Sequence, residues 1–207
     1  MNGAHEGDAV DLRVVKTRMA IEQAFIRLLA DTPFERITVQ NILDEALVNR
    51  KTFYSHYSDK YELADLLIEE QLAMLRTALE DRLSHDENEE GFPKVLREFY
   101  QNLLENRDSL LALMEVRTEN HCLRDELESL LKEAYCQRVA NDDDMEMDAL
   151  NLDYLSQYYA ATVSSSIRWF LATDDPHTLD VIEDVARMRE ENPAYRFLDA
   201  PFARKRG

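Results

Sequence analysis

The side chains best suited to chemistry are concentrated in residues 38–63, which read TVQNILDEALVNRKTFYSHYSDKYEL. Arginine and lysine can donate hydrogen bonds to guanine or to phosphate oxygens, and hydroxyl and imidazole groups can bond to bases or phosphates. A tyrosine adds an aromatic ring. Groups of all these kinds follow one another in the middle of the segment: Arg50, Lys51, Thr52, Tyr54, Ser55 and His56. These residue types predict contacts with a nucleic acid.

Two short helices joined by a tight turn are expected to position this set. Thr38 is the predicted N-cap of the first helix, and Asn49 is the predicted N-cap of the second. Phe53 and Tyr57 are four residues apart and are expected to face the core, so the polar set faces outward. Such a pair of helices can insert its second member into a major groove roughly 12 Å wide.

Amphipathic helices are predicted on both sides of this pair. Apolar residues at helical spacing indicate a helix over residues 12–31, which ends before Pro33. Ser58 is the expected cap of a long helix that reaches about Leu83. Thr38 and Lys60 stand at helix N-termini, where backbone N–H groups and the helix dipole favour a phosphate.

The remainder of the chain also indicates helices, over residues 92–106, 108–116, 119–140, 148–173 and 177–191. With only 4 Gly and 5 Pro, and hardly any strand-like alternation, the chain is predicted to be all-α. The expected organisation is a flexible tail (1–11), a three-helix helix-turn-helix domain (12–60) and a C-terminal helical domain (61–207). The last of these begins with the long helix.

Charge is distributed unevenly along the chain. The formal net charge at pH 7 is −18, yet residues 1–60 hold 8 Lys and Arg against 9 Asp and Glu. The remaining residues hold 16 against 33. The N-terminal part can therefore present a local basic surface while the rest repels polyanions, which would discourage non-specific binding to DNA.

Several function classes find no support in the sequence. No HExxH, GxSxG or glycine-rich phosphate loop occurs, so no enzyme, catalytic residue or cofactor is predicted. His121, Cys122 and Asp125 are close enough for metal ligands, but a surface ion pair between His121 and Asp125 is the favoured interpretation, and no metal is expected. The 2 cysteines, the missing signal-peptide pattern and the lack of a long apolar run predict a cytoplasmic protein without a membrane span.

Residues 12–63 resemble the TetR family of bacterial one-component regulators. The resemblance is carried by a long first helix, then T-V-x-x-I, then T-F-Y-x-H-Y-x-x-K-x-x-L, and the matching residues are Thr38, Val39, Ile42, Thr52, Phe53, Tyr54, His56, Tyr57, Lys60 and Leu63. One position departs from the pattern, because Leu47 stands in the turn where the family usually has Gly. Glycine adopts a positive φ without steric cost, so Leu47 implies strain or a different turn.

The resemblance implies a sequence-specific DNA-binding transcriptional regulator, a repressor that binds a palindromic operator in double-stranded DNA as a homodimer. The residues it implies for reading bases are Arg50, Lys51, Thr52 and Tyr54. Those it implies for holding the phosphate backbone are Thr38, Gln40, His56 and Lys60. An alternative stays open, in which a helical protein of the same fold acts through a protein partner rather than through DNA.

For the C-terminal domain, the resemblance implies that the last two long helices form a four-helix bundle with a second subunit. It also implies that a small-molecule effector binds inside the domain. The side chains expected to line such a pocket are Tyr100, Met114, Tyr135, Tyr158 and Trp169. The sequence does not identify the effector.

Overall fold

Segments with helical periodicity form helices throughout the part of the chain that the computed structural model describes, residues 12–83, 92–141 and 147–191. The N-terminal elements are α1 (Leu12–Asp31), the 3₁₀ helix η1 (Phe34–Arg36), α2 (Val39–Ala46), α3 (Arg50–Tyr54) and α4 (Lys60–Leu83). Those that follow are α5 (Phe92–Glu105), α6 (Arg107–Leu113), α7 (Leu123–Asn141), α8 (Ala149–Ala172) and α9 (Thr178–Glu191). The prediction of an all-α protein is confirmed for these residues.

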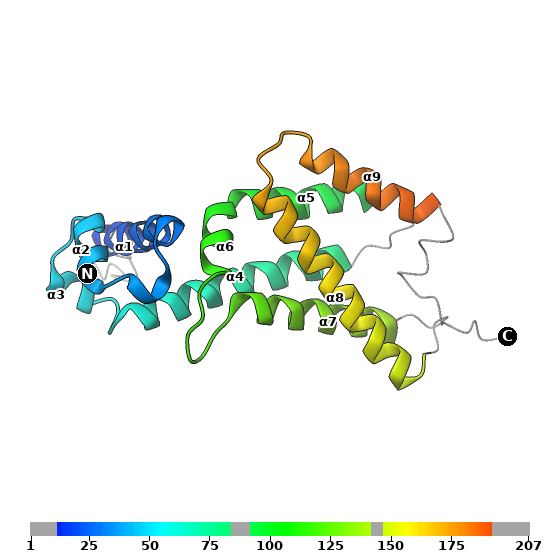
Figure 1. Ribbon diagram of the computed structural model, residues 1–207, viewed down its shortest axis with the longest axis horizontal. Coiled ribbons are helices and arrows are strands. Elements are labelled where there is room, and N and C mark those ends of the chain that lie inside the picture. Colours follow the sequence, from blue (N-terminus) through cyan, green and yellow to red (C-terminus); the bar gives the residue numbers. More distant parts are fainter. Residues whose placement is uncertain (1–11, 84–91, 142–146, 192–207) are drawn as a thin grey trace, which may run out of the picture.

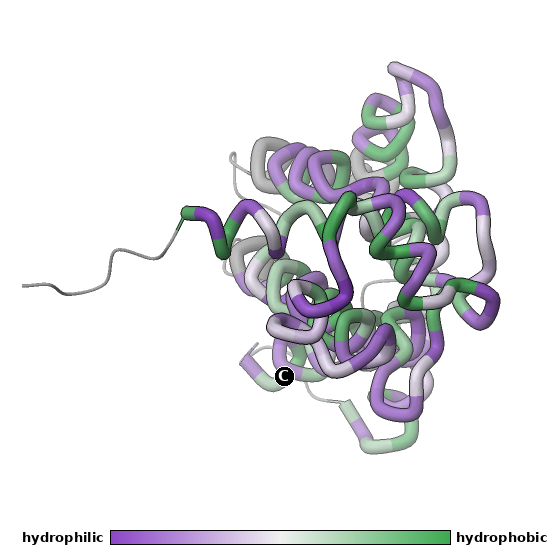
Figure 2. Tube along the Cα trace, turned by 90° about the vertical axis from the view of Figure 1, so that its left-hand side faces the viewer, coloured by the Kyte–Doolittle hydropathy of each residue, from purple (hydrophilic) through white to green (hydrophobic). Residues whose placement is uncertain are grey.

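The helices are arranged as two ends joined by α4. Helices α1 to α3 gather at one end of the molecule, and α4 runs from there into a body formed by α5 to α9 (Figure 1). Within the body α7 packs against both α8 and α4, and α5 packs against α9. Seen from the α1–α3 end, hydrophilic and hydrophobic residues alternate along the helices, as expected for amphipathic helices around a common core (Figure 2).

A single hydrophobic cluster extends through both ends. It includes Phe25 of α1, Ile68 and Leu75 of α4, and Phe170 of α8, all of which are essentially inaccessible to solvent. Helix α1 also packs directly against α6. The expected boundary between residues 60 and 61 falls at the start of α4, but the hydrophobic core continues across it. A shift of α4 is therefore felt by the α1–α3 end.

Two helix starts differ from the prediction. Asp59, not Ser58, caps α4, because its Oδ1 accepts the N–H groups of Tyr61 at 2.8 Å and Glu62 at 2.9 Å. Helix α7 begins at Leu123 rather than near residue 119, because the Thr118 hydroxyl oxygen accepts the N–H of His121 at 2.9 Å and holds a turn there. Side chains compete with helical hydrogen bonds at both places.

The predicted tail (1–11) lies outside the described residues. Among the helices described, none combines the length and apolar character that a membrane span requires.

Candidate nucleic-acid interface

A capping box fixes the start of α2, as the sequence predicted for Thr38. The Thr38 hydroxyl oxygen accepts the Asn41 N–H at 3.2 Å, and the Asn41 side-chain oxygen accepts the Thr38 N–H at 2.9 Å. Asparagine thus takes the place that Glu or Gln usually has in this motif. Because the Thr38 hydroxyl is part of this cap, it is already engaged before any ligand arrives.

The turn between α2 and α3 depends on Leu47. Its φ and ψ are 55° and 37°, in the left-handed region, and Leu47 is the one non-glycine residue with positive φ among those described. Its N–H and that of Val48 both donate to Leu43 O and close α2. The side chain is 91% exposed, so no packing offsets the steric strain. Of the two interpretations that the sequence left open, the strained turn is the one observed.

Helix α3 is short and separates its side chains into inner and outer sets. Asn49 caps it, because its Oδ1 accepts the Thr52 N–H at 2.9 Å. Phe53 and Tyr57 are buried, which confirms their predicted place in the core. Arg50 and Lys51 are exposed, and Tyr54 is 48% exposed although its ring touches Phe53. The outer face of α3 thus combines two cations and an aromatic ring.

The other predicted contact residues are engaged in local hydrogen bonds or half-buried. Gln40 accepts a bond from Arg50 Nη2 at 3.2 Å and donates one to Asp44 at 2.8 Å, so it joins α2 to α3. The Thr52 hydroxyl donates to Asn49 at 3.1 Å. The His56 ring is half-buried beside Tyr57. These contacts preorganise the surface and keep its polar atoms near the α3 face.

Lys60 differs from this set, because its ammonium is turned toward the protein backbone. Nζ donates to the carbonyl oxygens of Phe34 at 2.7 Å, Ile37 at 2.8 Å and Glu35 at 3.3 Å. It also lies 4.5 Å from the centroid of the Phe34 ring. Burial lowers the pKa of Lys60, against the opposing charge of Glu35. The side chain ties the start of α4 to η1.

A network that the sequence analysis missed positions the end of the recognition segment, by which we mean residues 49–57 (α3 with its cap and the turn after it). The Tyr57 hydroxyl donates to Glu22 Oε1 at 2.8 Å, and Arg18 Nε donates to the same oxygen at 2.5 Å. Arg18 also pairs with Glu70 of α4. Burial raises the pKa of Tyr57, and the bond to Glu22 and its charge raise it further. Spacing along the chain cannot reveal such a contact, because Tyr57 and Glu22 lie 35 residues apart.

The five side chains predicted to line an effector pocket lie in three different surroundings. Tyr100 and Met114 are buried in the main core, and the Tyr100 ring centroid lies 4.7 Å from that of Phe170. Tyr135 is buried in a small second cluster. Tyr158 and Trp169 are 39% and 45% exposed. Two hollows in the described surface, of about 430 and 480 Å³, border α1 and involve none of the five.

The possible metal ligands near residue 121 have other partners. His121 is paired with Glu126 and Glu69, whereas Asp125 is paired with Arg117 at 2.7 Å, so the expected ion pair between His121 and Asp125 is not formed. In the described parts of the chain, no three His, Cys, Asp or Glu side chains are grouped as metal ligands would be.

Comparison with known proteins identifies the N-terminal end. Residues 21–67 match the family model of bacterial regulatory proteins, tetR family. Over 65 residues the chain is 38% identical to the uncharacterized HTH-type transcriptional regulator YxbF of Bacillus subtilis (strain 168). That alignment covers 31% of this chain and 17% of YxbF, so the likeness concerns one domain and not the whole protein.

Solved structures extend the likeness in fold beyond the N-terminal end to most of the chain. A TetR transcriptional regulator from Streptococcus agalactiae 2603V shares 24% identity at a TM-score of 0.59, over 86% of this chain and 96% of that one. The dihydroxyacetone kinase operon activator DhaS shares 17% identity at a TM-score of 0.54, over 84% and 93%. At these identities the comparison establishes the all-helical fold.

Proposed function

We propose that this chain, whose residues 21–67 match the model of bacterial regulatory proteins, tetR family, is a sequence-specific DNA-binding transcriptional regulator, and a repressor. The observation that carries the proposal is the outer face of α3, where Arg50, Lys51 and Tyr54 are exposed while Phe53 anchors the helix from within. A helix so placed can enter a major groove with its polar side toward the bases.

The proposed roles of the side chains are those that the family resemblance implies. Base reading is assigned to Arg50, Lys51, Thr52 and Tyr54, and contacts with the phosphate backbone to Thr38, Gln40 and His56. The phosphate contact proposed for Lys60 is assigned to its main-chain N–H at the start of α4. Its ammonium is engaged by three carbonyl oxygens, and Asp59 already accepts the N–H groups of Tyr61 and Glu62.

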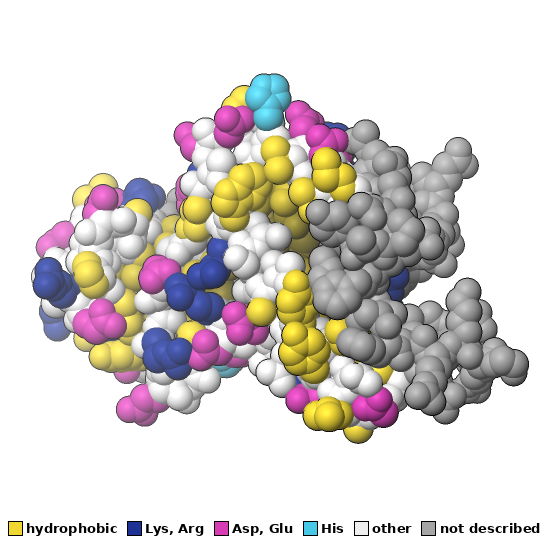
Figure 3. All heavy atoms as spheres, turned by 45° about the vertical axis from the view of Figure 1, so that its right-hand side comes forward, with side chains coloured by type: hydrophobic (Ala, Val, Ile, Leu, Met, Phe, Trp, Pro, Cys, Tyr) yellow, Lys and Arg dark blue, Asp and Glu magenta, His cyan; other side chains and the backbone are white. Residues whose placement is uncertain are grey.

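A homodimer is supported by an exposed apolar face on α8 and α9. Hydrophobic side chains gather on this side of the body, below and beside the histidine at its top (Figure 3). The large exposed ones are Leu150, Tyr154, Tyr158, Trp169, Val181, Val185 and Met188. Groups of large exposed apolar side chains often mark protein–protein interfaces. Two copies joined there would present two recognition helices to half-sites about 34 Å apart, which is the geometry of a palindromic operator.

A small-molecule effector remains part of the proposal. Such a ligand would have to bind more tightly to an arrangement that misplaces the recognition helices, because equal affinity for both arrangements shifts no equilibrium. Tyr100, Tyr135 and Trp169 lie in different surroundings, so they do not line one common cavity in the arrangement observed.

Selection of bound sequences from a random duplex library tests the proposal directly. We expect a palindromic consensus with half-sites one helical turn apart. Arg50→Ala should weaken binding by about 1–3 kcal/mol and relax the preference at one base pair of each half-site. Lys132→Ala is the matched control, since it removes a cation that pairs with Asp153 on the body. A dimer that enriches no sequence would overturn the proposal and favour a partner protein as the target.

A further inference from the structure

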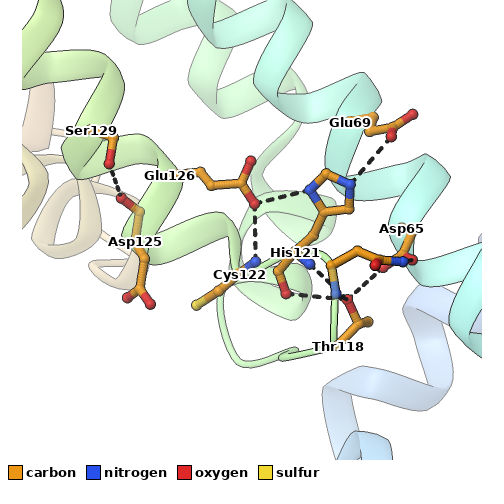
Figure 4. A network of polar contacts seen from close by, with 9 residues as sticks. Asp65, Glu69, Thr118, His121, Cys122, Asp125, Glu126 and Ser129 are labelled. Atoms are coloured by element: carbon orange, nitrogen blue, oxygen red, sulfur yellow. Dashed lines mark hydrogen bonds and ion pairs between the residues drawn. The ribbon is translucent and has the colours of Figure 1, made fainter.

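An ionic bridge through His121 connects α4 to α7. The imidazole belongs to the loop between α6 and α7, and it points between two carboxylates (Figure 4). Nδ1 lies 3.0 Å from Glu126 Oε1 on α7, and Nε2 lies 3.2 Å from Glu69 Oε1 on α4. An ionised carboxylate can accept hydrogen bonds but cannot donate them. Both ring nitrogens must therefore carry a proton for both contacts to be hydrogen bonds.

The charges around the ring favour that protonated form. Burial alone would lower the pKa of His121, but the hydrogen bond and charge of Glu126 and the charges of Asp65 and Glu69 raise it overall. The nearby cations of the loop and of α7 are held by other acids: Arg117 by Asp125 and Arg124 by Glu115. A neutral imidazole, with one N–H, could satisfy one carboxylate and would turn a lone pair toward the other.

The same loop grips α4 at a second point. The Thr118 hydroxyl donates to Asp65 Oδ1 at 2.5 Å, and the Asn120 amide donates to Asp65 Oδ2 at 2.7 Å. Asp65 and Glu69 lie one turn apart, in the part of α4 nearest to the recognition segment. Glu69 also borders the 480 Å³ hollow that Tyr57 and His56 line. The loop thus holds the body to the portion of α4 that carries the helix-turn-helix.

We propose that the proton is an effector of this protein. Protonation of His121 closes the bridge from α7 to Glu69, and loss of that proton removes one of the contacts that fix the position of the recognition helix α3 relative to the body. The stabilisation that the bridge gives to the fold is fully present below the ordinary imidazole pKa of 6.5. It is lost as the pH rises through the raised pKa of His121 in the folded protein. This inference rests on the proposed function, because its consequence is a change in operator binding.

The bridge itself is tested without DNA by NMR titration of the histidine side chains. His121 should titrate above the ordinary imidazole value of 6.5. The signal of His177, whose side chain is 80% exposed beside Asp180, serves as an internal control. Glu69→Gln keeps an acceptor and removes the charge, so it should lower the titration point of His121 by about half a unit or more and leave that of His177 unchanged. A His121 that titrates at the same pH in both proteins would overturn the bridge.

Operator affinity, measured from about pH 5.5 to about pH 8.5, tests the coupling. Because His56 belongs to the proposed DNA contacts, the quantity to compare is the ratio of the wild-type Kd to that of each variant. With Glu69→Gln and His121→Asn this ratio should change about three- to tenfold across the range. That change corresponds to a difference of about half to one unit between the pKa of His121 in the free protein and in the DNA-bound protein. His177→Gln should show a constant ratio.

The proposed DNA binding and the proposed coupling to pH can be refuted independently. A constant ratio for all three variants would refute the coupling and leave DNA binding intact. If the wild type binds no duplex at any pH, the proposed function fails, and the NMR titration still decides whether the bridge exists. Because Glu69→Gln changes one exposed carboxylate to an amide, it also remains informative where His121→Asn fails to fold.

Discussion

The ammonium of Lys60 lies 2.7 Å from the backbone oxygen of Phe34, across the junction between η1 and the start of α4. Further bonds to Glu35 and Ile37 make it a three-way clamp on the connection between α1 and α2. A lysine in that position would be interpreted as a phosphate contact from its sequence motif alone. The observed contacts give the Lys60 side chain a structural role.

Lys60→Met should therefore reduce stability and leave the electrostatics of DNA binding unchanged. Methionine keeps the apolar stem but leaves the carbonyl oxygens without their donor, which should lower the free energy of unfolding by about 1–3 kcal/mol. The slope of log K against log salt should equal that of the wild type, whereas a lost phosphate contact reduces it by about 1. A reduced slope with unchanged stability would show that the ammonium serves the DNA.

Leu47→Gly should stabilise the protein. Glycine adopts the left-handed φ of this turn without a clash, and removal of the exposed leucine side chain costs no packing. The net gain is expected to be about 0.5–1 kcal/mol, after the larger chain entropy of unfolded glycine is subtracted. Thermal melting of both proteins measures it. Leu47→Ala is the control, because it retains a Cβ and should gain little.

Tyr57→Phe should weaken the anchoring of the recognition segment. The change removes the hydroxyl bond to Glu22 but leaves the buried ring, and a bond to a charged group contributes about 1.5–3 kcal/mol. Partial exposure of the network places the expected loss near the lower end of that range. Chemical denaturation measures it. In a Glu22→Gln background the same substitution should have a smaller effect; an equal effect in both backgrounds would assign the loss to something other than this bond.

Val185→Glu and Trp169→Glu should each produce monomers. Both residues are about half-exposed on the apolar face of α8 and α9, and a charge there would be desolvated in the paired molecule. Light scattering coupled to size exclusion reports the mass. Leu12→Glu, at a more exposed apolar position on α1, should leave the assembly intact. A wild type that is monomeric at the concentrations used for DNA binding would contradict the proposed dimer.

Local patterns were sufficient to predict much of the fold. Periodicity placed α1 at residues 12–31 as observed, and capping residues placed Thr38 and Asn49 correctly. Helix starts failed where several acceptors compete within a few residues: Ser58 and Asp59 are neighbours, and only the geometry shows that Asp59 accepts the bonds.

Contacts between distant parts of the chain were beyond sequence reasoning. The bond from Tyr57 to Glu22, the clamp of Lys60 on η1 and the bridge of His121 to Glu69 each join separate helices or loops. Aromatic residues of α8 were another such case, since periodicity cannot say whether a helix face meets its own chain or a second copy. Tyr158 and Trp169, which were expected to line an effector pocket, are 39% and 45% exposed.

Helix α4 comprises 24 residues, a length of about 36 Å at 1.5 Å per residue. Its C-terminal part lies in the body, and its N-terminal end adjoins the helix-turn-helix (Figure 1). A tilt of only about 5° at the far end would displace the near end by about 3 Å, comparable to the spacing of successive base pairs. Small rearrangements among α5 to α9 can thus be magnified into a full step of register along the double helix.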